Sequence, residues 1–150
     1  MKNIFDKQVT EEVINRINQL QTTTKPQWGK MSVDQMLAHC NVTYEFLYEN
    51  VHPKPKGFKK WMLKTFVKSI VVSDKPYKKN GRTASEFLIT SQKEFTTEQD
   101  RLTSYIQKTQ DLGGDYFDQK ESHSFGKLSK TEWNNMFYKH LDHHLSQFGV

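Results

Sequence analysis

The stretch from Trp133 to Phe148 constrains the fold of this chain most strongly. Its large apolar residues recur at spacings of three and four, which predicts an amphipathic helix with one buried stripe. Just before it, Ser129 and Glu132 have the spacing of a capping box, which predicts where the helix begins. Such a stripe must be buried against other apolar faces, so the chain is expected to fold as packed helices.

Two histidines, His140 and His144, fall inside this apolar stripe. Four residues apart on a helix, they lie one turn from each other on the same face. Two imidazoles so placed can bind one transition metal, but a histidine on an apolar face can also be a hydrogen-bonded core residue. The pair alone leaves both interpretations open, and a third ligand would favour the metal. His143 is expected on the polar side of the helix, with Lys139 and Ser146.

Three other segments show the same helical pattern. Thr10 is expected to cap a first helix, which the polar run before Pro26 interrupts. Ser32 and Gln35 form a second capping-box pattern, and the helix that follows is expected to end around Asn50. A third helix is expected over residues 92–110, ended by the glycines at 113 and 114, and residues 122–128 are expected to be a turn-rich entry to the last helix.

The long connection between the second helix and residue 92 contains an ambiguous segment, residues 58–72. Residues 52–57 are expected to form an extended loop with His52 exposed, and residues 73–83 a further loop. Within 58–72, an apolar stripe alternates with four lysines: Lys59, Lys60, Lys64 and Lys68. The favoured interpretation is a helix docked on the bundle with its lysines in water. The alternative is a basic amphipathic helix that lies on an anionic membrane or reaches a phosphate.

Together these patterns predict an all-α fold, a four-helix bundle with one long crossover connection and an extra short helix. Residues 1–150 are expected to form a single domain, because that length is typical of one.

His39, in the second turn of the second helix, is the best candidate for a third metal ligand. Cys40 could also bind metal, but adjacent helical positions point about 100° apart, so a small core residue is the favoured interpretation. Glu98 and Gln99 fall on or near the inner face of the third helix, where either could face a metal or a substrate.

Composition restricts the remaining classes of protein. The chain has 22 basic and 17 acidic residues, a net charge of +5, and one cysteine, which excludes an intrachain disulfide. No secretory signal and no apolar run long enough for a membrane span is apparent, so a cytoplasmic protein is expected. The positive charge suggests nucleic-acid binding only weakly, because no motif that reads a nucleic acid is present, and no specific nucleic acid is expected.

Two motifs, Trp28-Gly-Lys-Met-Ser-Val-Asp-Gln-Met-Leu-Ala-His39 and Phe125-Gly-Lys-Leu-Ser-Lys-Thr-Glu-Trp133 leading into His140-Leu-Asp-His-His144, carry a family resemblance. Over nearly its whole length the chain resembles the DinB/YfiT-like superfamily of metal-dependent proteins, in a branch known only as a domain of unknown function. The resemblance implies a four-helix bundle with a long crossover after the second helix. It also implies one divalent metal held by His39, His140 and His144.

Three neutral imidazoles would make an open metal site of the catalytic type. Nitrogen ligands suit zinc or nickel first, with iron, cobalt or copper as alternatives. Relatives in the superfamily imply an enzyme acting on a small-molecule substrate, such as a thiol-dependent transferase or isomerase that uses a low-molecular-weight thiol. The alternative is a non-enzymatic stress-response or binding module with a structural or vestigial metal site. A homodimer is compatible with the sequence, and no catalytic residue beyond the metal ligands can be named.

Overall fold

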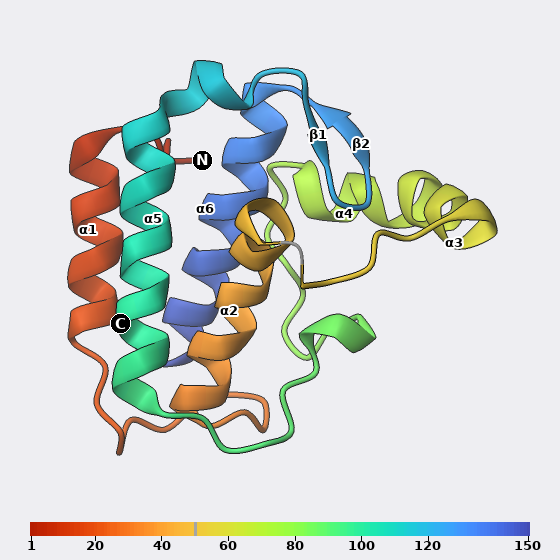
Figure 1. The fold of residues 1–150 in the computed structure, drawn as a ribbon. Coiled ribbons are helices and arrows are strands. Elements are labelled where there is room, and N and C mark those ends of the chain that lie inside the picture. The colour runs from red at the N-terminus through yellow and green to blue at the C-terminus, as the bar shows by residue number, and fades with distance from the viewer. Residues whose placement is uncertain (50) are drawn as a thin grey trace.

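Four helices are the longest elements of the computed structural model, which describes residues 1–49 and 51–150. They are α1 (Lys7–Asn18), α2 (Val33–Tyr48), α5 (Phe95–Phe117) and α6 (Lys130–Gln147). The four lie side by side (Figure 1), with α5 against α1 and α2, and α6 in contact with all three. The structure is mostly helical, so the expected all-α class is confirmed.

The starts of two helices follow the predicted capping boxes. Ser32 with Gln35, and Ser129 with Glu132, each make the reciprocal pair of contacts that satisfies the first free backbone N–H groups. The prediction for Thr10 was wrong, because α1 begins three residues earlier and Thr10 is buried inside it. Its hydroxyl donates to the carbonyl of Ile4 at 2.7 Å, so it ties the N-terminal residues to the helix. The second helix ends at Tyr48, and Asn50, where its end was expected, lies outside the described residues.

The third long helix, α5, is longer than predicted, but its glycines do interrupt it. Gly113 has φ 73° and ψ 160°, so the regular helix breaks there and a short helical stretch continues to Phe117. A two-stranded antiparallel hairpin, β1 (Lys120–Ser122) and β2 (Gly126–Leu128), then leads into α6. The expected turn-rich entry is therefore a small hairpin, which the sequence analysis did not predict.

The connection from α2 to α5 contains α3 (Gly57–Met62), the π-helical turn η1 (Leu63–Val67), α4 (Lys68–Val72) and the 3₁₀ turn η2 (Ser85–Phe87). The predicted extra helical piece is present, but the prediction that its apolar stripe docks on the other helices was wrong. Phe58 is 74% exposed and Phe66 is 60% exposed. The end of α4 is anchored in the protein, where Val72 is buried and its carbonyl accepts a hydrogen bond from Asn135 at 2.9 Å.

The core lies between the four long helices and is rich in aromatic rings. Phe137 of α6 stacks on Tyr44 of α2 at 5.3 Å between ring centroids and on Trp133 at 5.4 Å. The prediction that Lys139 lies on the polar side of the last helix was wrong. Its side chain is buried, and its ammonium group donates to the carbonyl of Ile70 at 2.8 Å. Because burial penalises the charged form, the pKa of Lys139 falls to about 8.

No helix within residues 1–49 and 51–150 has the length and apolar character needed to cross a bilayer. The cytoplasmic location stays a prediction.

Candidate metal centre

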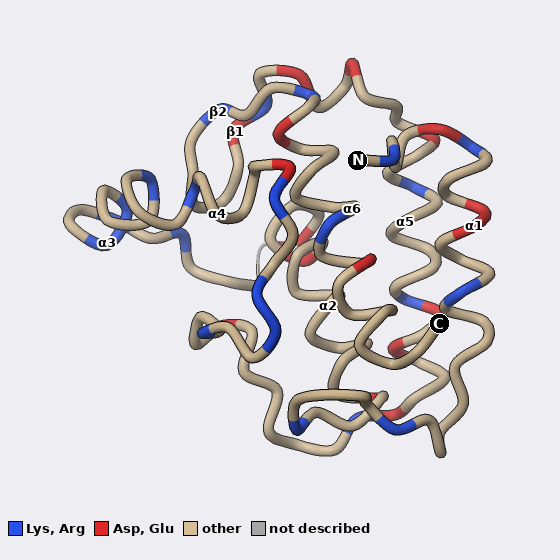
Figure 2. The backbone as a smooth tube through the Cα atoms, turned by 180° about the vertical axis from the view of Figure 1, so that it is seen from behind, with Lys and Arg blue, Asp and Glu red and all other residues tan. Residues whose placement is uncertain are grey.

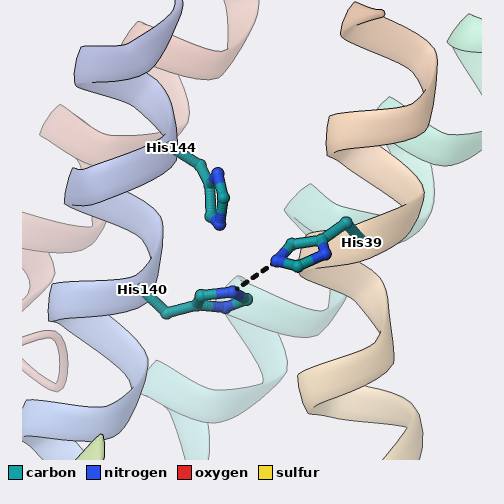
Figure 3. A group of neighbouring side chains, drawn as sticks. All are labelled: His39, His140 and His144. Carbon is teal, nitrogen blue, oxygen red and sulfur yellow. Dashed lines mark hydrogen bonds between the residues drawn. The ribbon is translucent and has the colours of Figure 1, made fainter. Parts of the chain in front are cut away.

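Three histidine side chains from two helices point toward one another in the interior. His39 lies on α2, and His140 and His144 lie one turn apart on α6 (Figure 3). The Nε2 atoms of His39 and His140 are 3.0 Å apart, and one nitrogen from each of the three rings lies within 4.8 Å of the others. Ligands at about 2.0–2.1 Å from a tetrahedral ion are roughly 3.3 Å from one another, so small side-chain shifts would complete such a site.

Hydrogen bonds from outside the cluster fix two of these rings. His39 donates from Nδ1 to the carbonyl of Phe87, in η2, at 2.9 Å. His144 donates from Nδ1 to the side-chain oxygen of Gln147 at 2.8 Å, and the Gln147 amide donates in turn to the carbonyl of Trp28 at 2.7 Å. Because a carbonyl can only accept, both rings carry their proton on Nδ1. Each neutral ring therefore presents the free lone pair of its Nε2 atom, which is the form that binds a metal.

The third ring, His140, has a partner that can serve either tautomer. Its Nδ1 atom lies 3.0 Å from the hydroxyl of Thr43, which is able to donate or to accept. In the contact with His39, the proton must lie on Nε2 of His140, because Nε2 of His39 is unprotonated, and Thr43 then donates to Nδ1. If the proton moves to Nδ1, Thr43 becomes the acceptor and its contact with His140 is kept, while the hydrogen bond between the two Nε2 atoms is lost and Nε2 of His140 is freed.

Burial keeps the three imidazoles neutral. His39 is 5% exposed and His144 is 7% exposed. Desolvation lowers the pKa of His144 to about 3 and that of His140 well below its usual value, and the neighbouring histidines add to both effects. The pKa of His39 is lowered for the same reason. The cluster is thus in the deprotonated form that metal binding requires.

A glycine in the first motif allows the bond that orients His144. Gly29 has φ +83°, and a Cβ atom there would come 2.6 Å from the amide nitrogen of Gln147. The backbone conformation favours glycine, and the missing side chain leaves room for Gln147.

A model of the family described as "Protein of unknown function (DUF1569)" matches residues 4–149. The chain belongs to the DUF1569 family. No curated protein and no solved structure matches the chain. The family match says nothing of the DinB/YfiT-like superfamily, so that resemblance stays a prediction.

The other three histidines of this DUF1569 chain lie outside the cluster. The ring of His143 packs edge-on against Trp28 and Tyr77, at 5.9 and 5.7 Å between centroids. His123, in the hairpin turn, stacks on Phe46 at 4.1 Å. The prediction that His52 is solvent-exposed was wrong, because it is partly buried and lies 2.7 Å from a carboxylate oxygen of Glu45.

The alternative ligands considered for the DUF1569 site have other partners. Cys40 is fully buried against the sulfur of Met36 at 3.8 Å, and burial raises the pKa of its thiol. Glu98 accepts from Asn41 at 2.8 Å and from Arg101 at 3.0 Å, so its charge is matched away from the cluster. Gln99 donates to the carbonyl of Ile17. Among the described residues, none of these three side chains joins the histidines as a possible metal ligand.

Sequence reasoning did not assign a role to Thr43, Phe87 or Gln147. Gln147 is three residues after His144, so helical spacing could have placed it beside that ring. Thr43 lies one turn after His39 on α2, but its hydroxyl contacts His140 of α6, a pairing that spacing along the chain does not predict. Phe87 contributes a backbone carbonyl from a loop distant in sequence, and no pattern of side chains indicates such a contact.

Proposed function

We propose that this DUF1569 protein is a metal-dependent protein that binds a divalent transition metal through His39, His140 and His144. The observation that carries the proposal is the convergence of three ring nitrogens within 4.8 Å. In this proposal α1, α2, α5 and α6 form a four-helix bundle of the DinB/YfiT-like type, and the connection from α2 to α5 is its long crossover. Zinc or nickel are the first candidates, with iron, cobalt and copper as alternatives, because nitrogen ligands suit all five.

A centre with three protein ligands would leave one coordination position open, which supports a catalytic site over a structural one. Structural zinc sites have four protein ligands, whereas catalytic sites keep three and leave one position for a small molecule. Within residues 1–49 and 51–150, the group has three members and no fourth histidine, cysteine or carboxylate joins it. When bound, the ion would supply Lewis acidity to an oxygen or sulfur atom of a small molecule.

The protein's own residues would determine how that position is presented. The carbonyl of Phe87 and the amide of Gln147 hold two of the rings in the metal-binding tautomer, and Thr43 supports the third in either tautomer. Loss of the hydrogen-bond partner of a ligating histidine typically lowers metal affinity by about tenfold to a hundredfold. These three contacts therefore belong to the proposed centre as much as the ligands do.

A cavity beside the cluster is the proposed place for a substrate. It has a volume of about 260 Å³, and Trp28, Tyr77, Lys139 and His143 are among its lining residues. None of the three cluster histidines lines this cavity, but the ring of Tyr77, which does, packs edge-on against His140 and so links the cavity to the proposed centre. A larger groove of about 590 Å³ between α1 and α5 is lined by residues remote from the histidines, so we assign it no role. The small volume suits a low-molecular-weight thiol as substrate or co-substrate, in a transferase or isomerase reaction.

The proposal is tested first by the metal content of protein purified without a metal-affinity column. About one equivalent of a transition metal per chain is expected, because a single three-histidine group is present among the described residues. Protein reconstituted with cobalt should then change its visible spectrum on addition of cysteine, whereas serine, which has a hydroxyl in place of the thiol, should leave the spectrum unchanged. Because cysteine and serine share their amino and carboxylate groups, a difference between their effects on the spectrum reports on the thiol alone.

The alternative function is a non-enzymatic stress-response or binding module with a structural or vestigial metal site. The burial of His39 and His144 and the packing of Phe87 over His39 favour it, since they limit access. Bound metal with a cobalt spectrum that ignores cysteine would support this alternative. Protein that neither retains a metal nor binds added zinc or cobalt would overturn the metal-dependent function and would favour the alternative with a vestigial site.

A further inference from the structure

The segment of residues 57–72, formed by α3, η1 and α4, exposes an apolar surface. Five of its large apolar side chains are each at least 40% exposed: Phe58, Trp61, Met62, Phe66 and Ile70. The rings of Phe58, Trp61 and Phe66 pack on one another, with centroids 5.5 and 5.9 Å apart, and so form one continuous patch. Figure 1 shows α3 projecting away from the four long helices.

Contacts on the other side of the segment attach it to the protein. Three lysines pair with carboxylates on η2, the hairpin and α6, namely Lys59 with Glu86, Lys60 with Glu121 and Lys68 with Glu132, at 2.7, 3.6 and 2.9 Å. At its end, the carbonyl of Val72 is held by Asn135. The usual amphipathic arrangement is therefore reversed, because polar groups face the protein and the apolar patch faces outward.

The surroundings of the patch are positively charged. Residues 51–73 contain six lysines and no aspartate or glutamate, and Figure 2 shows basic but no acidic positions along α3. Lys54, Lys56 and Lys64 form no ion pair with a carboxylate among the described residues. The aromatic patch fits a partner with an apolar interior, and the unpaired lysines fit one with a negatively charged surface.

We propose that the 57–72 segment docks on the surface of an anionic lipid bilayer. The rings of Phe58, Trp61 and Phe66 would enter the boundary between headgroups and acyl chains, where Trp and Phe are favoured. The lysines without a carboxylate partner among the described residues would reach the lipid phosphates, whose negative potential attracts basic residues. A second copy of this chain fits less well, because two such faces would bring their lysines together.

Co-sedimentation with lipid vesicles tests the docking. The protein should sediment with vesicles of phosphatidylcholine mixed with phosphatidylglycerol, and far less with vesicles of pure phosphatidylcholine. Its tryptophan emission should shift to the blue on binding, and the shift should be lost in Trp61→Phe, because Trp61 is exposed at the patch. Two variants, Trp61→Ser with Phe66→Ser, and Lys54→Gln with Lys56→Gln and Lys64→Gln, should each weaken binding at least about tenfold.

Tyr116→Ser is the matched control, because Tyr116 is an aromatic residue 47% exposed and outside the segment. It should bind vesicles like the parent, and all variants should keep their far-UV circular dichroism. Failure of the parent to bind anionic vesicles at low salt would overturn the proposal. So would full binding by the Trp61→Ser, Phe66→Ser variant, which would show charge attraction alone. A parent that is dimeric by light scattering, with that variant monomeric, would assign the patch to a second copy instead.

Discussion

The last helix and the 57–72 segment have the same kind of apolar pattern in sequence and opposite environments in the structure. In α6, Trp133 is 2% exposed and Phe137 is 1% exposed, whereas Phe58 and Phe66 are 74% and 60% exposed. Spacings of three and four occur in both. The pattern therefore predicts which residues share a face, but it does not predict what that face contacts.

The difference has a physical origin in continuity and in charge. The α6 helix runs unbroken over 18 residues from a capping box, so its stripe meets three other helices along its length. The 57–72 segment is divided into stretches of 6, 5 and 5 residues by a π-helical turn. Its lysines reach carboxylates on the protein surface, and this orientation leaves the apolar side facing outward.

Truncation of one phenylalanine in each region should give the largest difference. Phe137→Ala should lower the free energy of unfolding by about 3–5 kcal/mol, because it removes a fully buried ring and leaves a cavity. Phe66→Ala should change it by about 0.5 kcal/mol or less, because its ring is mostly in water. Urea unfolding followed by circular dichroism measures both. Equal losses would show that the patch is buried in solution, against another copy or against the protein itself.

Alanine substitution of each histidine should separate ligands from bystanders. His39→Ala, His140→Ala and His144→Ala should each weaken metal binding at least about a hundredfold, because two nitrogens hold an ion far less well than three. His143→Ala, His52→Ala and His123→Ala should keep the metal, because their rings have partners outside the cluster. Metal analysis with circular dichroism on all six variants is the measurement. Retention of metal by His39→Ala would remove the assigned third ligand.

The sequence predicted those parts of the fold that depend on neighbours along the chain. The capping boxes at Ser32 and Ser129 and the break at Gly113 follow from local spacing and backbone freedom, and the structure shows all three. The burial of Lys139 could not be predicted, because it depends on carbonyl groups at the end of α4 that lie beside it only in the folded chain.

The candidate site divides in the same way between local and distant contacts. The placement of His140 and His144 on one face follows from helical geometry, and the structure brings His39 to them from α2. The Phe87 carbonyl and the Trp28 carbonyl that holds Gln147 both come from loops, so neither contact has a sequence signature. That the three histidines bind a metal stays a prediction.

Two glycines, Gly29 packed against Gln147 of α6 and Gly57 at the start of the 57–72 segment, allow a sharper test of the contacts around the histidines. Gly29 and Gly57 both have positive φ, so alanine should cost each variant roughly 1–2 kcal/mol of stability. Only at Gly29 would the new Cβ displace the amide of Gln147, since no atom lies within 4 Å of a Cβ at Gly57. Gly29→Ala should therefore weaken zinc binding about tenfold, and Gly57→Ala should leave it unchanged. Isothermal titration of zinc into the metal-free variants measures the difference, and equal affinities would show that Gln147 does not support His144.

The smallest effect expected is the dependence of zinc affinity on pH, and it distinguishes a buried cluster from exposed imidazoles. A free histidine titrates near 6.5, so at about pH 5.5 each is roughly 90% protonated, and three such ligands would lose affinity about a thousandfold. In the folded protein, burial lowers the pKa of His144 to about 3 and also lowers those of His39 and His140, so protons compete only in more acidic solution.

Zinc affinity should therefore fall less than about tenfold between pH 7 and pH 5.5. The same lowered histidine pKa values reduce the stability of the metal-free fold in acidic solution. Below about pH 6.5 the unfolded chain takes up protons that the folded cluster does not, so stability should decline as pH falls through this range. Zinc titrations should be paired with circular dichroism, so that loss of the fold is not counted as loss of affinity. A thousandfold fall in zinc affinity while the helical signal is unchanged would show that the three imidazoles have ordinary pKa values, and would place the cluster in water like the apolar patch of residues 57–72.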